Sequence, residues 1–113
     1  MTQAHTDGTV VYEVTCHLDA DIVDAWLAWI PGHVAEILAV PGMLSAKAWE
    51  VVDPVPARRR SFCLQYTARD WTALETYLTD HAPRLRADGV ARFGARFAAD
   101  RRVGRWVARW GGE

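Results

Sequence analysis

The residues of this chain best suited to acid–base chemistry are His33 and Glu36, which stand three positions apart in a largely apolar segment. On a helix this spacing places two side chains one turn apart on neighbouring faces. Because an imidazole titrates near neutral pH, His33 is a candidate general base in a pocket, with the Glu36 carboxylate orienting it. The alternative is structural: the pair would then only steady a helix.

Four arginines in the segment HAPRLRADGVARFGARF, residues 81–97, suggest a second kind of site. A guanidinium group binds carboxylates and similar anions through a planar set of donors. We expect Arg92 or Arg96 to be the one that holds an anionic ligand, if the segment does more than connect a helix to a strand. Helical spacing directs Leu85, Val90 and Phe93 toward a core. It directs Arg84, Arg86 and Arg92 elsewhere.

His17, Cys63 and Gln65 form a third candidate group, because two strand-like runs would place them on one sheet face. They are either packing residues of an interface or a catalytic Cys-His pair, although nothing nearby in the sequence lowers the thiol pKa. The four histidines are scattered, and neither HxxxH nor CxxC occurs. We therefore predict no metal and no cofactor.

Composition excludes several classes of function. The chain has 113 residues, a formal net charge of -1 and six tryptophans. This charge gives no general attraction to nucleic acid or to an anionic membrane, and no apolar run is long enough to span a bilayer. The run Arg58-Arg59-Arg60 is expected to be a solvated turn. The polar N-terminus does not resemble an export signal, so we expect a cytoplasmic protein with reduced, buried cysteines.

The elements that must position these residues follow from periodicity. Alternating residues predict strands over 9–18, 43–53, 58–68 and about 96–103. Helical spacing predicts one helix from about residue 20, capped by Asp19 or Asp21, and a second capped by Asp70. Proline inside a helix costs about 3 kcal/mol, so we expect a kink or a restart at Pro31 and a local restart at Pro83. The tail after the last strand is expected to be a short helix or a strapped-down segment.

This order of elements, β-α-β-β-α-β, predicts an α+β ferredoxin-like fold. Right-handed crossovers give a four-stranded antiparallel sheet in the order 4-1-3-2, with both helices on one face. We assign residues 1–8 to a flexible leader and residues 9–113 to a single domain. The other sheet face has no cover within the chain. An RNA-binding module with the same order of elements places aromatic residues on that uncovered face. Here Phe62 and Tyr66 should face the helices instead. We therefore predict no nucleic-acid partner.

The chain resembles domain of unknown function family 4286, which is grouped with the dimeric α/β-barrel superfamily. The resemblance covers roughly residues 10 to 103. It rests on short motifs: Trp26-Leu27 with Trp29, His33-x-x-Glu36, Gln65-Tyr66, Leu74-Glu75-x-Tyr77-Leu78, His81-Ala82-Pro83 and Arg92-Phe93-Gly94-x-Arg96-Phe97.

This resemblance implies a homodimer whose two sheets close into a barrel, but it supplies no reaction. The superfamily includes cofactor-free oxygenases, cyclases and isomerases, so the expected function is such chemistry on an aromatic or polycyclic small molecule. In that scheme His33 takes a proton, and Gln65 or an arginine steadies the oxyanion. The competing function is a non-catalytic ligand-binding or dimerisation module. The Pro31-Gly32 break is the expected mouth of the pocket, and its expected walls are Trp26, Trp29, Trp49, Tyr66 and His33.

Overall fold

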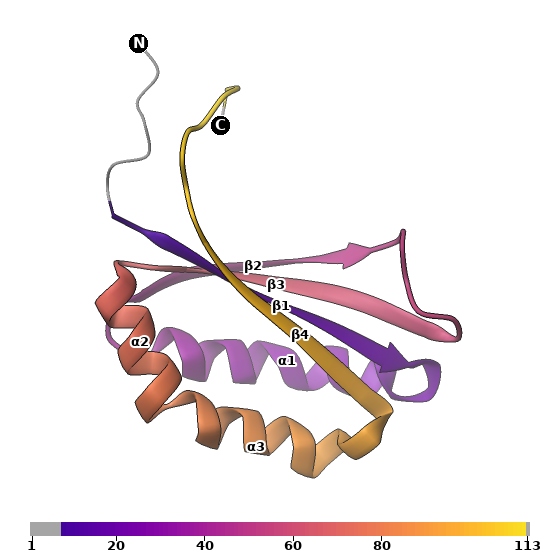
Figure 1. The fold of residues 1–113 in the computed structure, drawn as a ribbon. Coiled ribbons are helices and arrows are strands. Elements are labelled where there is room, and N and C mark those ends of the chain that lie inside the picture. Colours follow the sequence, from indigo (N-terminus) through magenta and orange to yellow (C-terminus); the bar gives the residue numbers. More distant parts are fainter. Residues whose placement is uncertain (1–7, 113) are drawn as a thin grey trace.

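The computed structural model describes residues 8–112 and has the predicted ferredoxin-like architecture (Figure 1). The leader expected over residues 1–8 lies outside the described residues except for Gly8. The elements are β1 (Val10–Asp19), the short helix η1 (Ala20–Ile22), α1 (Val23–Leu38), β2 (Met43–Val51), β3 (Arg59–Ala68), α2 (Trp71–Asp80), α3 (Ala82–Phe93), η2 (Gly94–Arg96) and β4 (Phe97–Arg105).

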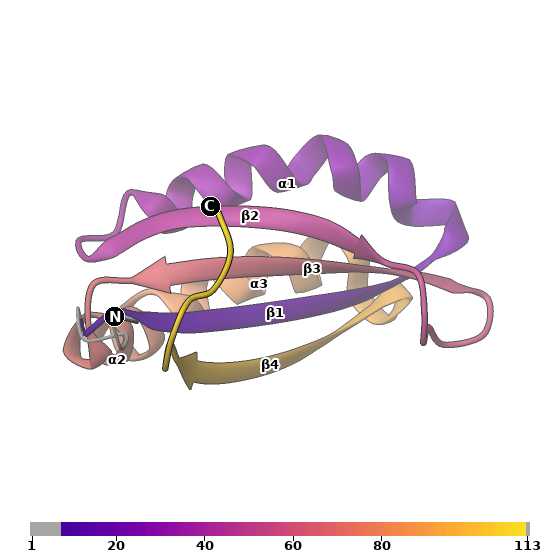
Figure 2. The ribbon, with the colours of Figure 1, turned by 90° about the horizontal axis from the view of Figure 1, so that it is seen from above.

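The four strands form one antiparallel sheet in the order β2-β3-β1-β4, which is the predicted order read from the opposite edge (Figure 2). The helices all lie on one face of this sheet (Figure 1). The opposite face, which we call the open face, is covered by no helix of the described chain. Strands β1 and β3 are neighbours, with Tyr12 opposite Tyr66 and Thr15 opposite Cys63.

The period of two in the first strand is confirmed. Along β1, residues at even positions from Val10 to Leu18 are buried, and those at odd positions are partly exposed. The buried set faces α1, α2 and α3 and forms the core together with Phe62, Leu64 and Tyr66 of β3. The core therefore lies between the sheet and the helices, on the side where His33 is also found.

The restart expected as one alternative at Pro31 is wrong, because α1 runs without interruption from Val23 to Leu38 with Pro31 inside it. The other alternative, a kink, stays a prediction. Proline removes a hydrogen bond to the carbonyl four residues earlier, which here belongs to Leu27. Both Pro31 and Leu27 are exposed, so the bond is lost on the solvent side of the helix. Neither Pro31 nor Gly32, the expected mouth, lines the cavity between the sheet and the helices.

The second helical region follows the prediction more closely. The Asp70 side chain accepts a hydrogen bond of 2.8 Å from the backbone N–H of Ala73, as expected of an N-cap. The helix then restarts before Pro83, and α3 ends at Gly94, where φ is +54°. Asp19 does not cap the first helix: its carboxylate binds Arg59 instead.

The last strand extends to Arg105, and residues 106–112 have no regular structure. The expected alternative of a C-terminal helix is therefore wrong. The tail leaves the sheet on the open side and leans across the strands (Figures 1 and 2). Val107 and Trp110 in this tail are 76% and 80% exposed. No helix among residues 8–112 is long and apolar enough to cross a membrane.

Candidate functional site

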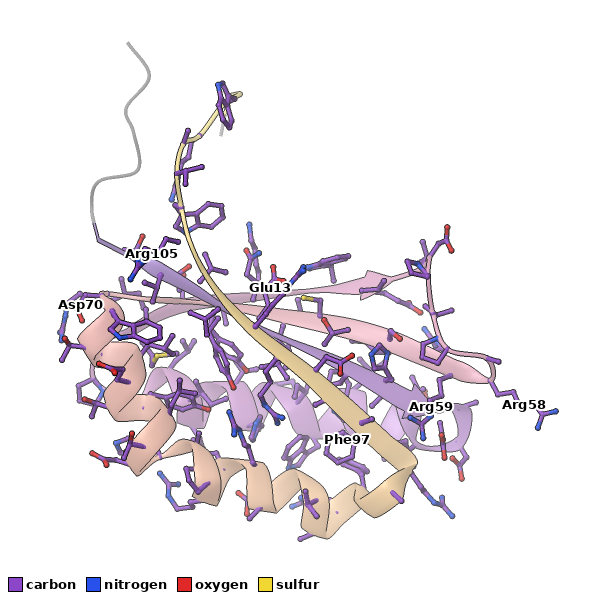
Figure 3. All side chains as sticks on the ribbon, in the orientation of Figure 1. Glu13, Arg58, Arg59, Asp70, Phe97 and Arg105 are labelled. Carbon is purple, nitrogen blue, oxygen red and sulfur yellow. The ribbon has the colours of Figure 1, made fainter. Side chains whose placement is uncertain are left out.

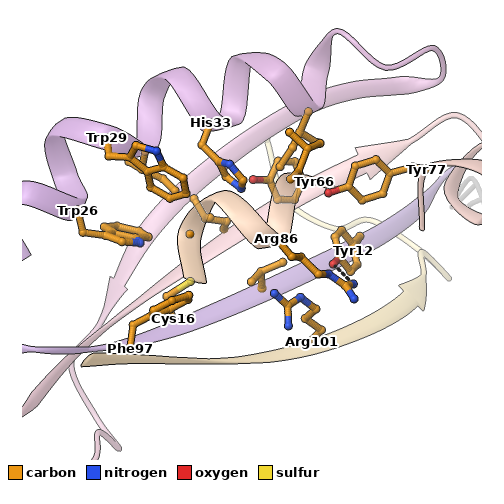
Figure 4. A pocket seen from close by; sticks show the side chains of 16 residues that line it. Tyr12, Cys16, Trp26, Trp29, His33, Tyr66, Tyr77, Arg86, Phe97 and Arg101 are labelled. Carbon is orange, nitrogen blue, oxygen red and sulfur yellow. Dashed lines mark hydrogen bonds between the residues drawn. The ribbon is translucent and has the colours of Figure 1, made fainter. Parts of the chain in front are cut away.

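A small cavity of about 50 Å³ lies between the sheet and helices α1 and α3 (Figure 4). Since a water molecule takes up about 30 Å³ in the liquid, this volume is on the scale of one or two waters. Most of its wall is apolar or aromatic. Its polar members are His33, three tyrosines and two arginines, namely Tyr12, Tyr66, Tyr77, Arg86 and Arg101.

His33 reaches this cavity from α1. Its ring stacks on Trp29 with 4.4 Å between the ring centroids. The Nδ1 atom is buried and has no hydrogen-bond partner in the described part of the chain. Burial lowers the pKa of His33 below its ordinary value, and Arg101 lowers it further, whereas Glu36 and Asp88 act in the opposite direction. The imidazole is therefore neutral at neutral pH and has an unused nitrogen at the cavity wall.

Glu36 does not lie in the cavity. Its side chain is exposed, and it makes no hydrogen bond with the buried Nδ1 atom of His33. Its effect on His33 is electrostatic, because the carboxylate raises the pKa of the imidazole from a distance. The geometry thus brings His33 to the pocket without the orienting contact that the sequence spacing suggested.

Two arginines enter the cavity from different elements. Arg86 of α3 donates a hydrogen bond of 3.0 Å from Nη2 to the Tyr12 hydroxyl, while its buried Nε–H has no acceptor among the described residues. Arg101 of β4 is more exposed and lies at the edge. Figure 4 shows the Arg86 guanidinium beside the Tyr12 hydroxyl and Arg101 among the side chains that line the same pocket. They give this end of the cavity a positive charge.

These are not the arginines that the sequence analysis selected. Arg92 and Arg96 are exposed and do not line the cavity, and Arg96 pairs with Asp21. Helix α3 instead buries Ala82, Leu85, Gly89 and Phe93. Arg86 follows Ala82 by four positions and precedes Gly89 by three, so it lies on this buried face. This spacing could have indicated that Arg86 is on the buried face. Alanine and glycine, however, mark a buried face only weakly, because their side chains are small.

Burial keeps the hydroxyls of Tyr66 and Tyr77 protonated. Tyr12 lies beside Tyr66 and Tyr77, with ring centroids 5.9 Å and 6.0 Å apart. Burial raises the pKa of Tyr66 well above its ordinary value and raises that of Tyr77 to about 12. At neutral pH these groups can donate hydrogen bonds to an oxygen of a ligand, but they cannot act as bases.

The predicted aromatic walls are divided between the two faces of the sheet. Trp26, Trp29 and Tyr66 line the cavity with His33, and Trp26 stacks on Phe62 at 5.3 Å. Trp49 is half exposed and pairs in register with Cys63, so it lies on the open face. Gln65 also lies there. Neither residue can contact a ligand in the cavity, because the sheet separates them from it.

The open face carries a separate polar network, which includes Glu13 (Figure 3). Glu13 accepts hydrogen bonds of 2.8 Å from Gln65 Nε2 and from Arg102 Nε. His17 lies 2.6 Å from the Ser61 hydroxyl through Nδ1 and 3.0 Å from Asp100 through Nε2. Ser61 is fully buried, so its hydroxyl is not available as a nucleophile. The contacts instead cross-link β1, β3 and β4.

The cysteines do not have the environment of a reactive thiol. Cys63 is buried on the open face, and burial raises its pKa, while a hydrogen bond with Thr15 lowers it. Cys16 is buried on the helix side, and burial raises its pKa to about 11. Both are free. These shifts disfavour the thiolate, which is the nucleophilic form.

The remaining candidate features serve structure. Arg59 and Arg60 of the arginine run form ion pairs with Asp19 and Glu50. Phe62 and Tyr66 are buried on the helix side. Within residues 8–112, no three His, Cys, Asp or Glu side chains are grouped so as to hold a metal ion.

Solved structures share this fold at low sequence identity. A conserved protein of unknown function from Bacteroides thetaiotaomicron, described as a possible oxidoreductase, is 12% identical with a TM-score of 0.65, covering 89% of this chain and 100% of the other. A mutant form of SnoaB, a cofactor-independent oxygenase from Streptomyces nogalater, is 14% identical with a TM-score of 0.63, covering 90% and 95%. A dimeric ferredoxin-like protein from an uncultured marine organism is 15% identical with a TM-score of 0.58, covering 90% and 98%.

These likenesses concern the fold alone. No curated protein matches the sequence. The family model described as domain of unknown function (DUF4286) matches residues 9–105, which include all four strands and every residue that lines the cavity. The chain therefore belongs to the DUF4286 family, as its motifs indicated, and has the ferredoxin-like fold.

Proposed function

We propose that this protein is a small-molecule enzyme in which His33 takes a proton from an acidic C–H or O–H group of a bound ligand. The observation that carries the proposal is the buried Nδ1 atom of His33, which has no partner among the described residues and lies at the wall of a cavity. Buried polar atoms are almost always hydrogen-bonded, so an orphaned one at a cavity indicates a missing polar partner.

The proton transfer balances without further reagents. In the tautomer that carries its proton on Nε2, the Nδ1 lone pair accepts the ligand proton, and the electron pair stays on the ligand as an enolate or phenolate. The imidazolium that forms lies against the face of Trp29, and a cation over an indole is favourable. The positively charged guanidinium groups of Arg86 and Arg101 stabilise the negative charge that forms on the ligand.

Removal of such a proton is a first step common to oxygenases, cyclases and isomerases that use no cofactor. The likeness to the cofactor-independent oxygenase SnoaB supports this class of chemistry at the level of fold. The cavity of about 50 Å³ is smaller than an aromatic ligand, so we expect its walls to shift when such a ligand binds. A polycyclic substrate, as the sequence analysis expected, would need a larger opening of the cavity than a ligand with a single ring.

The same small volume favours the second candidate, a non-catalytic module. In that case aromatic side chains fill the space between sheet and helices, and the protein serves for assembly. The two candidates differ in whether a ligand that enters the cavity loses a proton to His33.

We also propose that the protein is a homodimer that pairs the open faces of two sheets. Trp49 on this face and Trp110 of the tail give it exposed aromatic surface, as is common at protein interfaces. One of the structures with this fold is described as dimeric. Pairing would cover the polar network of Glu13 and His17. It would not cover the His33 cavity, which lies on the helix side of the sheet.

Deuterium exchange tests the proton transfer. The probe is 2-tetralone, an aromatic ketone with an acidic C–H, in D₂O. We expect the protein to accelerate exchange at this carbon and His33→Gln to reduce that acceleration by roughly 100-fold or more, the usual range for a general base. The matched control is His17→Gln on the open face, which should keep the wild-type rate. Saturable binding of 2-tetralone without accelerated exchange would favour the module.

A further inference from the structure

We infer that the natural ligand of the His33 cavity is an aromatic carboxylate whose anionic group binds Arg86 and Arg101. This inference rests on the proposed ligand-binding role of the cavity and adds the charge of the ligand. It does not depend on proton transfer by His33, because a bound anion can be detected whether or not it reacts.

The first argument is the charge of the cavity wall. Two arginines line the cavity, and no Asp or Glu does. In the described part of the chain neither of the two forms a salt bridge with a carboxylate, whereas arginines elsewhere do, namely Arg59, Arg60, Arg69, Arg96 and Arg102. Glu36 and Asp88 influence His33 only from outside the lining. Among the described residues, the two arginines of the cavity therefore lack the carboxylate partner that the five salt-bridged arginines have.

The second argument is the hydrogen bonding of Arg86. Its Nη2 is directed at the Tyr12 hydroxyl, and its Nε–H is buried without an acceptor in the described structure. A guanidinium group presents these N–H donors in one plane, which fits the two oxygens of a carboxylate. An oxygen acceptor in this position would satisfy the unused donor.

The third argument is the shape and chemistry of the remaining wall. Beyond the arginines the cavity is bounded by flat rings, with Trp29 stacked on His33 and set edge-on to Phe93. A Cβ atom on Gly89 would lie 3.4 Å from Phe97 and 3.5 Å from Trp29. The absence of a side chain at Gly89 thus keeps the cavity wall open beside these two rings. A ring with a carboxylate matches both halves of the site.

The test compares benzoate with benzamide, which has nearly the same shape but no charge, by isothermal titration calorimetry. We expect the wild-type protein to bind benzoate at least 10-fold more tightly than benzamide. Arg86→Met and Arg101→Met keep an unbranched side chain of similar length but remove the charge, and each should weaken benzoate binding at least 10-fold. Arg86→Lys should retain part of the affinity, which separates loss of charge from loss of folding.

Arg92→Met is the matched control, because Arg92 lies on the same helix but outside the cavity. It should bind benzoate like the wild type. Inorganic phosphate is the third probe, and binding as tight as that of benzoate would show an anion site without aromatic selectivity. Such tight phosphate binding would overturn the inference. Equal affinity for benzamide, unchanged affinity in the Arg86 and Arg101 variants, or no binding of benzoate would also overturn it. Anion binding without exchange of 2-tetralone would overturn only the proposed function.

Discussion

At the scale of single residues, His33 is the group whose surroundings depart most from those of a surface histidine. It is held neutral by burial and is in contact with Trp29 rather than with a carboxylate. A neutral imidazole in a water-poor site accepts a proton only when the resulting charge is compensated, here by the anion formed on the ligand. The structure therefore couples the basicity of His33 to the presence of a ligand.

The lowered pKa of His33 predicts how stability depends on pH. The unfolded chain binds a proton at His33 below about pH 6.5, whereas the folded protein resists it. This contribution to stability is therefore present above pH 6.5 and is lost as the pH falls through the folded pKa. Urea unfolding at pH 7.5 and pH 5.5 should show a smaller loss of unfolding free energy for His33→Gln than for the wild type. Equal losses in both proteins would contradict a buried, neutral His33.

The arginines show what sequence spacing can and cannot predict about the site. His33, Trp26, Trp29 and Tyr66 were predictable because each belongs to a strongly apolar stripe. Arg86 was not, because the buried face of α3 is marked partly by Ala82 and Gly89, whose small side chains carry a weak signal. Val90 is by type the better core residue, yet it is 60% exposed.

Arg101 was missed for a different reason. It belongs to β4, where an arginine two positions beyond Ala99 shares the helix-facing side with Phe97. The alternation there is interrupted by charged residues, so the residue pattern indicates no clear inner face. Which arginines converge depends on how α3 packs over β4, and this is a property of the tertiary fold.

At the scale of elements, the turn between α1 and β2 packs closely against the start of α2. Gly42 has φ of +89°, and its carbonyl accepts a hydrogen bond of 2.7 Å from the Arg69 backbone, just before α2. A Cβ atom on Gly42 would lie 2.5 Å from the Cβ of Ala73. The close approach and the positive φ both require glycine at this position.

Two glycine substitutions should therefore have opposite effects. Gly42→Ala should lower the free energy of unfolding by roughly 1–3 kcal/mol or more, because it adds backbone strain and a clash with α2. Gly32→Ala should raise it by about 0.5–1 kcal/mol, because Gly32 lies inside α1 and a Cβ there meets no atom within 4 Å. Denaturant unfolding of the two variants measures both. A stabilised Gly42→Ala protein would show that this turn is placed incorrectly.

The elements themselves were largely predictable, since alternation and helical spacing are local properties. The exception is Pro31, where a kink or a restart was expected but α1 continues, with Pro31 on its exposed side. Local sequence predicts the lost hydrogen bond but not which side of the helix loses it. Only the orientation of the helix on the sheet decides that question.

At the scale of the whole molecule, one face of the sheet is covered by no helix of the described chain, and the C-terminal tail leans across part of it. The tail leaves the sheet on the same side as the open face (Figure 2). A second copy with the same surface would cover the exposed rings of Trp49 and Trp110, two of the six tryptophans of the chain.

A charge on the open face should dissociate the dimer. Trp49→Glu places a carboxylate where two sheets are proposed to meet, and desolvating an unpaired charge is costly. Trp71→Glu is the control, because Trp71 is similarly exposed, at 41%, but begins α2 on the other side of the sheet. Native mass spectrometry should find dimers of the wild type and of Trp71→Glu and monomers of Trp49→Glu. A monomeric wild-type protein would contradict the barrel.

The most direct test of the central claim is to observe the cavity while a ligand binds. Side-chain ¹H–¹⁵N NMR spectra report the Arg86 Nε–H and the His33 imidazole separately from the same groups of Arg92 and His17. On titration with benzoate, we predict saturable shifts of Arg86 and His33 with one affinity and no shift of Arg92 or His17. If Arg86 and His33 do not shift, or if only groups on the open face respond, the cavity is not the ligand site.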